Sequence, residues 1–187
     1  MNNNLSNKGK FIKSPDFKNN VKKNIEDIGN FDLKGSYYNF LNKKTIYNLK
    51  NNKSYISLKS FGKRHILFLT KIKNKNGEKN YSIFINKKND DFIICKLKFN
   101  ESVFNGTLLD GELVKNNEGN WIFLIDDIPY YKGESIITSK LSDRYELLKN
   151  LIDNEYIEDP NINMCLIEYK KNYNLKKIQY LVDFQEK

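Results

Sequence analysis

One short segment of the sequence places a lysine beside two further cations. It reads KSFGKR over residues 59–64 and follows an apolar run. A lysine amine attacks phosphorus only when it is unprotonated, and nearby positive charge with partial burial lowers its pKa from about 10.4 toward neutrality. Lys63 and Arg64 supply such charge, and Gly62 lets the backbone turn closely past a ligand. The segment predicts either a nucleophilic Lys59 or an ordinary surface charge at a strand end.

Two later segments carry carboxylates that suit the same chemistry. TLLDGELV, residues 107–114, contains Asp110 and Glu112, and FLIDDI, residues 123–128, contains Asp127. Taken alone, these side chains can be ordinary polar residues of strands, and Asp-Gly-Glu also suits a turn.

The elements that must position these segments are short strands. Between residues 55 and 128, apolar runs alternate with turn signals near Gly77, Asp90 and Gly119, which predicts consecutive antiparallel strands. We expect the strands at Tyr55–Leu58, His65–Ile72, Tyr81–Asn86, Phe92–Phe99, Thr107–Lys115 and Asn120–Asp127.

Helical patterns lie before and after these strands. Ser14 as N-cap and Pro15 as first residue predict a helix over Pro15–Ile28. We expect a helical or irregular segment over 37–49. After the strands we expect a helix with Ser142 as its cap, whose inner face carries Leu141, Tyr145, Leu148 and Ile152. A strand at Met164–Lys170 and a short helix from near Asn174 are expected to follow.

The predicted fold class is α+β, with a curved antiparallel β-sheet core and flanking helices. Residues 1–10 are polar and are expected to form a disordered tail. The 187-residue length favours one domain, which we place at residues 11–187.

Together, the segments around Lys59, Glu112 and Asp127 resemble the covalent nucleotidyltransferases, most closely the guanylyltransferase domain of mRNA capping enzymes. TLLDGELV is nearly identical to that family's third motif. FLIDDIPYYKGESIITSKLSDRYELLKNLI and CLIEYKKNYNLKKIQYLVDF are similar to the elements that follow it there. The resemblance spans about residues 41–184 and implies a partial nucleotidyltransferase-like fold without the oligonucleotide-binding lid domain.

The resemblance also implies roles for individual residues. Lys59 is the counterpart of the lysine that forms a phosphoramide with GMP, and Arg64 of the arginine that contacts the nucleotide. Glu112 matches a carboxylate that contacts the nucleotide or its metal, and Lys87 lies where the family often has a ribose-contacting arginine. The implied nucleotide-binding set is Gly62, Lys63, Arg64, Lys87, Asp110, Glu112 and Asp127; GTP and Mg²⁺ are implied if the protein is active, and no metal ligand is assigned.

The sequence departs from the family pattern in three ways. Phe61 stands where the family has an acidic residue, and Asp126 stands where it has an aromatic that stacks on the purine. The sequence ends at Lys187, before the fourth and fifth motifs, which carry a metal-binding carboxylate and phosphate-facing lysines. Phosphoryl transfer depends mainly on positioning and charge stabilisation, so these departures predict a degenerate protein with vestigial catalysis.

Three functions stay open at this point. The first is a degenerate guanylyltransferase-like protein that binds an RNA 5′ end, a cap or a guanine nucleotide. The second is an active enzyme in which Lys59 transfers GMP from GTP to diphosphate RNA while a partner supplies the missing motifs. The third is a scaffold subunit of a capping or transcription complex, with Phe61 filling the pocket.

The net charge of +9 and the pI near 9.3 are compatible with binding to RNA phosphates. Arg64 and Arg144 are the only arginines and alanine is absent, which indicates an AT-rich coding genome, such as that of a large DNA virus. The positive charge can therefore also reflect an ordinary solvated lysine surface rather than RNA binding. Tyr130, Tyr131 and Lys132 fit either an RNA-stacking surface or sheet core and edge.

The remaining composition excludes several classes of site. Cys95, Cys165 and the single His65 cannot form a zinc site or a disulfide framework, so both cysteines are expected to be buried apolar residues. No apolar run of about 18 residues and no secretory signal is present. We therefore expect an intracellular, cytoplasmic protein, located in a viral factory or virion if it is viral. We also expect it to bind a protein partner, to make no membrane contact and not to read DNA sequence.

Overall fold

The computed structural model describes residues 9–29, 55–57, 59–74, 77–86, 88–89 and 91–174. The chain divides into two compact units. The first comprises residues 1–34 and 61–169, and the second comprises residues 35–60 and 170–187. In the second unit, β2 (Tyr55–Ser57) pairs antiparallel with β10 (Asn172–Asn174).

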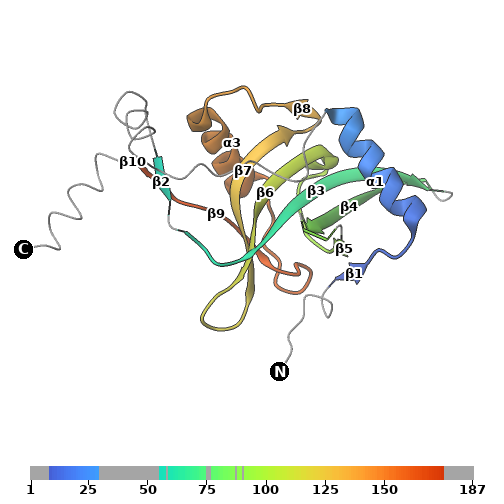
Figure 1. The fold of residues 1–187 in the computed structure, drawn as a ribbon, viewed down its shortest axis with the longest axis horizontal. Coiled ribbons are helices and arrows are strands. Elements are labelled where there is room, and N and C mark those ends of the chain that lie inside the picture. Colours follow the sequence, from blue (N-terminus) through green and yellow to red (C-terminus); the bar gives the residue numbers. More distant parts are fainter. Residues whose placement is uncertain are drawn as a thin grey trace, which may run out of the picture. The chain divides into compact units, whose positions relative to one another are not determined.

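The described part of the first unit contains one sheet of eight strands (Figure 1). The strand order is β1-β5-β4-β3-β6-β7-β8, with antiparallel neighbours, and β9 pairs in parallel with β7. The strands are β1 (Lys10–Phe11), β3 (Lys63–Asn74), β4 (Gly77–Asn86), β5 (Phe92–Cys95), β6 (Asn105–Lys115), β7 (Trp121–Tyr131), β8 (Glu134–Ser135) and β9 (Leu166–Tyr169). The expected antiparallel sheet is confirmed, and the parallel pairing of β9 is an addition that the sequence pattern did not specify.

Two helices pack on opposite faces of this sheet. Along a strand, successive side chains alternate between faces. On one face, α1 (Pro15–Ile28) buries Val21 and Ile25 against Ile66 and Phe68. On the other face, α3 (Leu141–Asn154) buries Leu148 and Leu151 in a cluster with Leu67, Leu69, Leu109, Leu113, Phe123 and Ile125.

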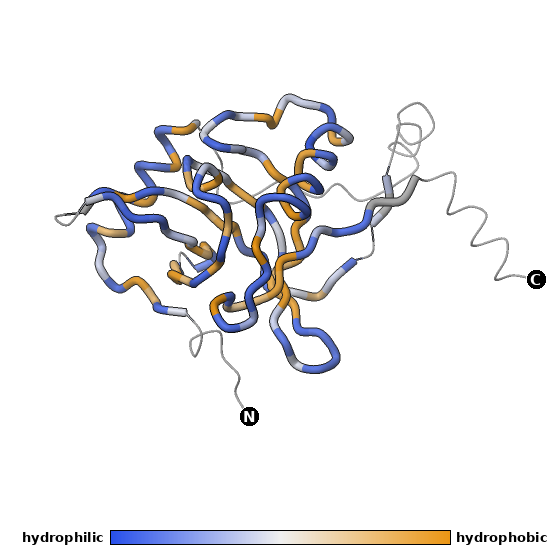
Figure 2. Tube along the Cα trace, turned by 180° about the vertical axis from the view of Figure 1, so that it is seen from behind, coloured by the Kyte–Doolittle hydropathy of each residue, from blue (hydrophilic) through white to orange (hydrophobic). Residues whose placement is uncertain are grey.

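Local chemistry explains several of these elements. The Ser14 hydroxyl accepts a hydrogen bond from the Phe17 amide at 3.4 Å, which caps α1 as predicted. The β6–β7 turn is closed by the Asn116 amide, which donates to the Asn120 carbonyl at 3.0 Å, and by Gly119, whose φ of 83° suits glycine. Figure 2 shows that the tip of this hairpin is hydrophilic. The central strand β3, in contrast, carries four successive buried apolar residues over 66–69.

Several expected boundaries were wrong. Lys10 belongs to β1 rather than to a disordered tail, because it pairs with Ile94 of β5. Lys140, not Ser142, occupies the N-cap of α3, and the Ser142 hydroxyl instead donates to Asp143 Oδ1 at 3.1 Å. Leu141 is 38% exposed because the helix has only begun there.

Two of the predicted strands are shorter than expected. The strand predicted at Phe92–Phe99 ends at Cys95, although Phe99 still bridges to Tyr156. The strand predicted at Met164–Lys170 covers Leu166–Tyr169, and Asn174, near which a helix was expected to begin, ends β10.

Other predictions fall on residues that the structure does not describe. These are the tail up to residue 8, the segment at 37–49, Leu58 and the chain beyond Asn174. The division into a tail and one domain over 11–187 stays a prediction. Within the described ranges, neither α-helix has the length and apolar character needed to cross a membrane.

Candidate functional site

Strand register brings the predicted motif residues together. Arg64 of β3 pairs directly with Glu112 of β6, so their side chains leave the sheet on one face. Asp110 precedes Glu112 by two residues and shares that face. On β7 the register shifts, because Asp110 pairs with Asp127 while Gly111 pairs with Ile125. Asp126 is therefore the extra residue of a β-bulge, a feature that redirects side chains.

Arg64 is surrounded by three carboxylates, and we name Arg64, Asp110, Glu112 and Asp126 the Arg64 cluster. The Nη2 atom lies 3.4 Å from both carboxylate oxygens of Asp110. The Nη1 atom lies 3.5 Å from Glu112 Oε1 and contacts the carboxylate of Asp126. The four side chains are only 11–28% exposed. One guanidinium thus meets three carboxylates in a largely buried place, where unpaired charge would be costly.

Glu112 also binds the backbone at the start of β3. The Gly62 amide donates to Glu112 Oε2 at 3.2 Å, so one carboxylate bridges Gly62 and Arg64. A Cβ at position 62 would lie 2.7 Å from the Leu113 carbonyl oxygen. Gly62 is therefore required by the close approach of this segment to β6. No ligand contact is needed to explain this glycine.

The Asp-Gly-Glu motif lies within β6 and does not form a turn. Its glycine, Gly111, packs against β7, because an added Cβ would lie 2.4 Å from the Leu124 carbonyl oxygen. The two carboxylates flanking Gly111 therefore stand on one face of the sheet, at a place where the backbones of β6 and β7 pack tightly.

The other residues of the predicted site are dispersed. Phe61 is 91% exposed, so the alternative in which its ring fills the pocket is wrong. Lys63 is exposed, and as the strand neighbour of Arg64 it points away from the cluster face. Lys59 belongs to the second unit, and its meeting with Glu112 stays a prediction. Lys87 lies outside the described residues.

Asp127 is engaged by Arg144, near the start of α3. The Nε and Nη2 atoms of Arg144 donate to the two carboxylate oxygens of Asp127 at 2.8 and 2.9 Å. The Nη1 atom donates to the carbonyls of Ile137 and Ser139 at 3.2 and 2.6 Å. This bidentate pair joins β7, the β8–α3 loop and the helix. In this structure, Asp127 positions α3.

We expect Arg144→Lys to lower the free energy of unfolding by about 2 kcal/mol, because an ammonium cannot reproduce the two parallel bonds to Asp127 or reach both carbonyls. Chemical denaturation followed by circular dichroism would measure this loss. Lys149→Arg, an exposed change on the same helix, serves as the control and should shift stability by less than about 0.5 kcal/mol. An unchanged midpoint in Arg144→Lys would show that the pair contributes little.

His65 is a buried residue of β3, only 3% exposed. Its Nδ1 lies 2.8 Å from the Lys63 carbonyl oxygen, and its ring packs edge-on against Phe84 at a centroid distance of 6.0 Å. Burial lowers the pKa of His65, because it disfavours the charged ring, while the bond to the Lys63 carbonyl partly opposes this effect. His65 therefore packs within the sheet.

The pKa of His65 predicts a pH dependence of stability. Below about pH 6.5 the unfolded chain gains a proton on this ring before the folded protein does. The free energy of unfolding should therefore fall as the pH drops from 7.5 to 5.5. Since His65 is the only histidine, urea denaturation of His65→Gln across this range should give a flatter profile. Equal slopes for the two proteins would contradict the prediction.

The aromatic–lysine segment at residues 130–132 belongs to the core and the edge of the sheet rather than to a surface for stacking RNA bases. Tyr130 is 3% exposed and packs with the α1 cluster. The Tyr131 hydroxyl donates to Glu155, and Lys132 Nζ lies 3.0 Å from the same carboxylate and 4.7 Å from the centre of the Tyr131 ring. Burial, followed by the bond to Glu155, raises the pKa of Tyr131. The side chains of Tyr131, Lys132 and Glu155 therefore contact one another.

The described residues contain no group of three or more His, Cys, Asp or Glu side chains that could hold a metal ion. In the Arg64 cluster the carboxylates face a guanidinium, and a cation there would have to compete with it. The set does not fit a resident Mg²⁺. Cys95 and Cys165 are both buried, as expected, and burial raises the pKa of the Cys95 thiol well above its ordinary value.

Asp126 and Arg144 are the residues that motif reasoning did not assign. The only signal for Asp126 is its departure from the expected aromatic, and the only signal for Arg144 is its position near a helix start. Both act through partners distant in the sequence.

Comparison with known proteins gives one family. The family described as mRNA capping enzyme, catalytic domain, matches residues 10–185. A search of the curated proteins finds no match.

Proposed function

Because the chain belongs to the family of mRNA capping enzyme catalytic domains, we propose that it is a guanylyltransferase-like protein that binds a guanine nucleotide, a cap or an RNA 5′ end. In this proposal, GMP transfer by the chain alone is weak or absent. The proposal also places the protein in a cytoplasmic capping complex with a protein partner.

The contact between Asp126 and Arg64 carries this proposal. Arg64 is the arginine that the resemblance assigns to the nucleotide, yet its guanidinium is shared among three carboxylates. The four residues of the cluster carry three carboxylates for one guanidinium, which does not favour phosphate binding at Arg64 itself. Its acceptor oxygens suit hydrogen-bond donors, such as ribose hydroxyls and the N–H groups of a guanine edge.

Phe61 supports the same conclusion. Its exposed ring supplies no carboxylate at the position where the family has one. The pocket wall therefore lacks a charged group that the family pattern has at this position, which fits weak or absent catalysis.

Covalent labelling combined with a binding measurement tests the proposal. The purified chain is incubated with α-³²P-GTP and magnesium, and acid-stable label is measured on the wild type and on Lys59→Ala. We expect no label in either protein, and saturable binding of a fluorescent GTP or cap analogue to both. Strong label that disappears in Lys59→Ala would overturn the proposal, and so would the absence of any binding.

The second candidate is an active guanylyltransferase, and the pairing of Arg64 with Glu112 and of Gly62 with Glu112 favours it. In that reaction the Lys59 amine would attack the α-phosphorus of GTP, pyrophosphate would leave, and GMP would pass to the terminal phosphate oxygen of diphosphate RNA. Label from GTP but not from ATP would identify this activity; label from ATP alone would indicate a ligase-like protein.

A further inference from the structure

A groove distinct from the Arg64 cluster lies where the N-terminal strand meets α1. It is lined by residues 9–14 together with Phe17, Tyr81 and Ile94. Its volume of about 940 Å³ falls in the range of sites for organic ligands, about 300–1,000 Å³, and is far larger than an ion requires. None of these lining residues belongs to the Arg64 cluster.

The groove combines aromatic rings with exposed lysines. Phe11 is 40% exposed, and Phe17 and Tyr81 form an edge-to-face pair with a centroid distance of 5.5 Å. Lys10 and Lys13 flank Phe11 and are both exposed, and none of the lining residues is acidic. Rings for stacking and ammonium groups for phosphates are the two components of single-strand nucleic-acid sites.

The wall of the groove is held in place by the sheet. β1 pairs with β5 through Lys10 and Phe11, and the Ile12 amide donates to the Phe92 carbonyl at 2.9 Å. At Gly9, an added Cβ would lie 2.5 Å from Ile93 Cγ2, so glycine allows the strand to approach β5 closely. The positions of Lys10 and Phe11 are thus set by backbone pairing, and Lys13 follows directly after the paired Ile12.

We infer that this groove binds single-stranded RNA, with a base stacked on Phe11 and phosphates paired with Lys10 and Lys13. The choice of RNA as the occupant rests on the proposed function, because a capping-family protein acts on RNA ends. In this inference, the groove holds a segment of the RNA strand at a place separate from the proposed nucleotide site.

Fluorescence anisotropy with a labelled ten-residue oligouridylate at several salt concentrations tests this site. Phe11→Ala should weaken binding roughly tenfold, since stacking on an aromatic contributes about 1–3 kcal/mol per base, and Phe11→Tyr should retain binding. Lys10→Ala/Lys13→Ala should weaken binding and reduce the slope of log K against log salt by about 1.4, or about 0.7 for each phosphate that is no longer neutralised.

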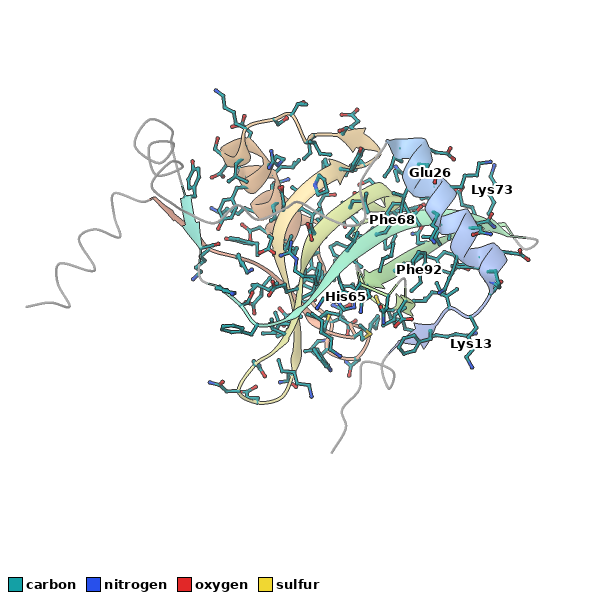
Figure 3. All side chains as sticks on the ribbon, in the orientation of Figure 1. Lys13, Glu26, His65, Phe68, Lys73 and Phe92 are labelled. Carbon is teal, nitrogen blue, oxygen red and sulfur yellow. The ribbon has the colours of Figure 1, made fainter. Side chains whose placement is uncertain are left out.

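A matched control removes the same charge elsewhere. Lys73→Ala/Lys149→Ala also deletes two exposed lysines; Figure 3 shows Lys73 well apart from Lys13, and Lys149 lies on α3, on the other face of the sheet. This variant should bind within about twofold of wild type. Equal weakening in both double variants would overturn the inference, because it would indicate non-specific attraction. No effect of Phe11→Ala, no oligouridylate binding, or equal competition by oligoglutamate would also overturn it.

The outcome can be separated from that of the proposed function. Binding of fluorescent GTP to Lys10→Ala/Lys13→Ala should equal that of wild type, because neither lysine belongs to the Arg64 cluster. If GTP binds but oligouridylate does not, the groove inference alone fails. If oligouridylate binds through Phe11 but no guanine nucleotide or cap analogue binds, the proposed function alone fails.

Discussion

Replacing Arg64 with methionine is expected to lower the free energy of unfolding by about 3 kcal/mol. The change leaves Asp110, Glu112 and Asp126 together without their shared cation, and these carboxylates are only 11–21% exposed. Removing one partner of a largely buried ion pair costs about 3–5 kcal/mol, and partial exposure favours the lower end. Urea denaturation at pH 7 would measure the loss.

Two further variants show whether this loss comes from the carboxylates. Lys63→Met removes the adjacent exposed cation and should change stability by less than about 0.5 kcal/mol. Arg64→Met/Asp126→Asn removes one of the repelling charges and should recover part of the loss. If the double variant is no more stable than Arg64→Met, the contact of Asp126 with Arg64 is energetically unimportant.

Replacing Asp126 with phenylalanine is expected to raise the affinity for GTP roughly tenfold. The change releases Arg64 from one of its three carboxylates and supplies a ring where the family has one. Stacking of a base on an aromatic contributes about 1–3 kcal/mol, and 1.4 kcal/mol corresponds to tenfold. Titration with fluorescent GTP, or calorimetry with GTP itself, would measure the change.

Asp126→Asn separates the two contributions to this gain. It removes the charge without adding a ring, so any increase in affinity that it shares with Asp126→Phe comes from the release of Arg64. The remainder comes from stacking. Weaker binding in both variants would contradict the prediction, because it would mean that hydrogen bonds from the nucleotide to the Asp126 carboxylate outweigh the release of Arg64.

The pairing of Arg64 with Glu112 shows how far motif reasoning reaches. The two residues lie 48 positions apart in the sequence, and β3 and β6 place them directly opposite one another. The two segments meet because each forms a strand and the two strands are neighbours in the sheet, which places residues in register opposite one another. The motif assigns Lys59 to the same site, and its meeting with Glu112 stays a prediction.

Asp127 shows where the same reasoning stops. As a motif carboxylate it was assigned to the nucleotide, yet Arg144 binds both of its oxygens. A strand pattern specifies which residues alternate, but it cannot specify which helix will pack beside them. The partner of Asp127 is decided by the placement of α3, which depends on packing over the whole unit.

The sequence by itself determined the α+β class, the succession of strands and the family, because alternation, turn residues and motif spacing are local properties of the chain. Only the tertiary structure decided that Asp126 joins Asp110 and Glu112 around Arg64, and that residues 9–14 form a groove with Tyr81 and Ile94. The physical reason is that a bulge on β7 and the pairing of β1 with β5 arise from contacts between distant segments.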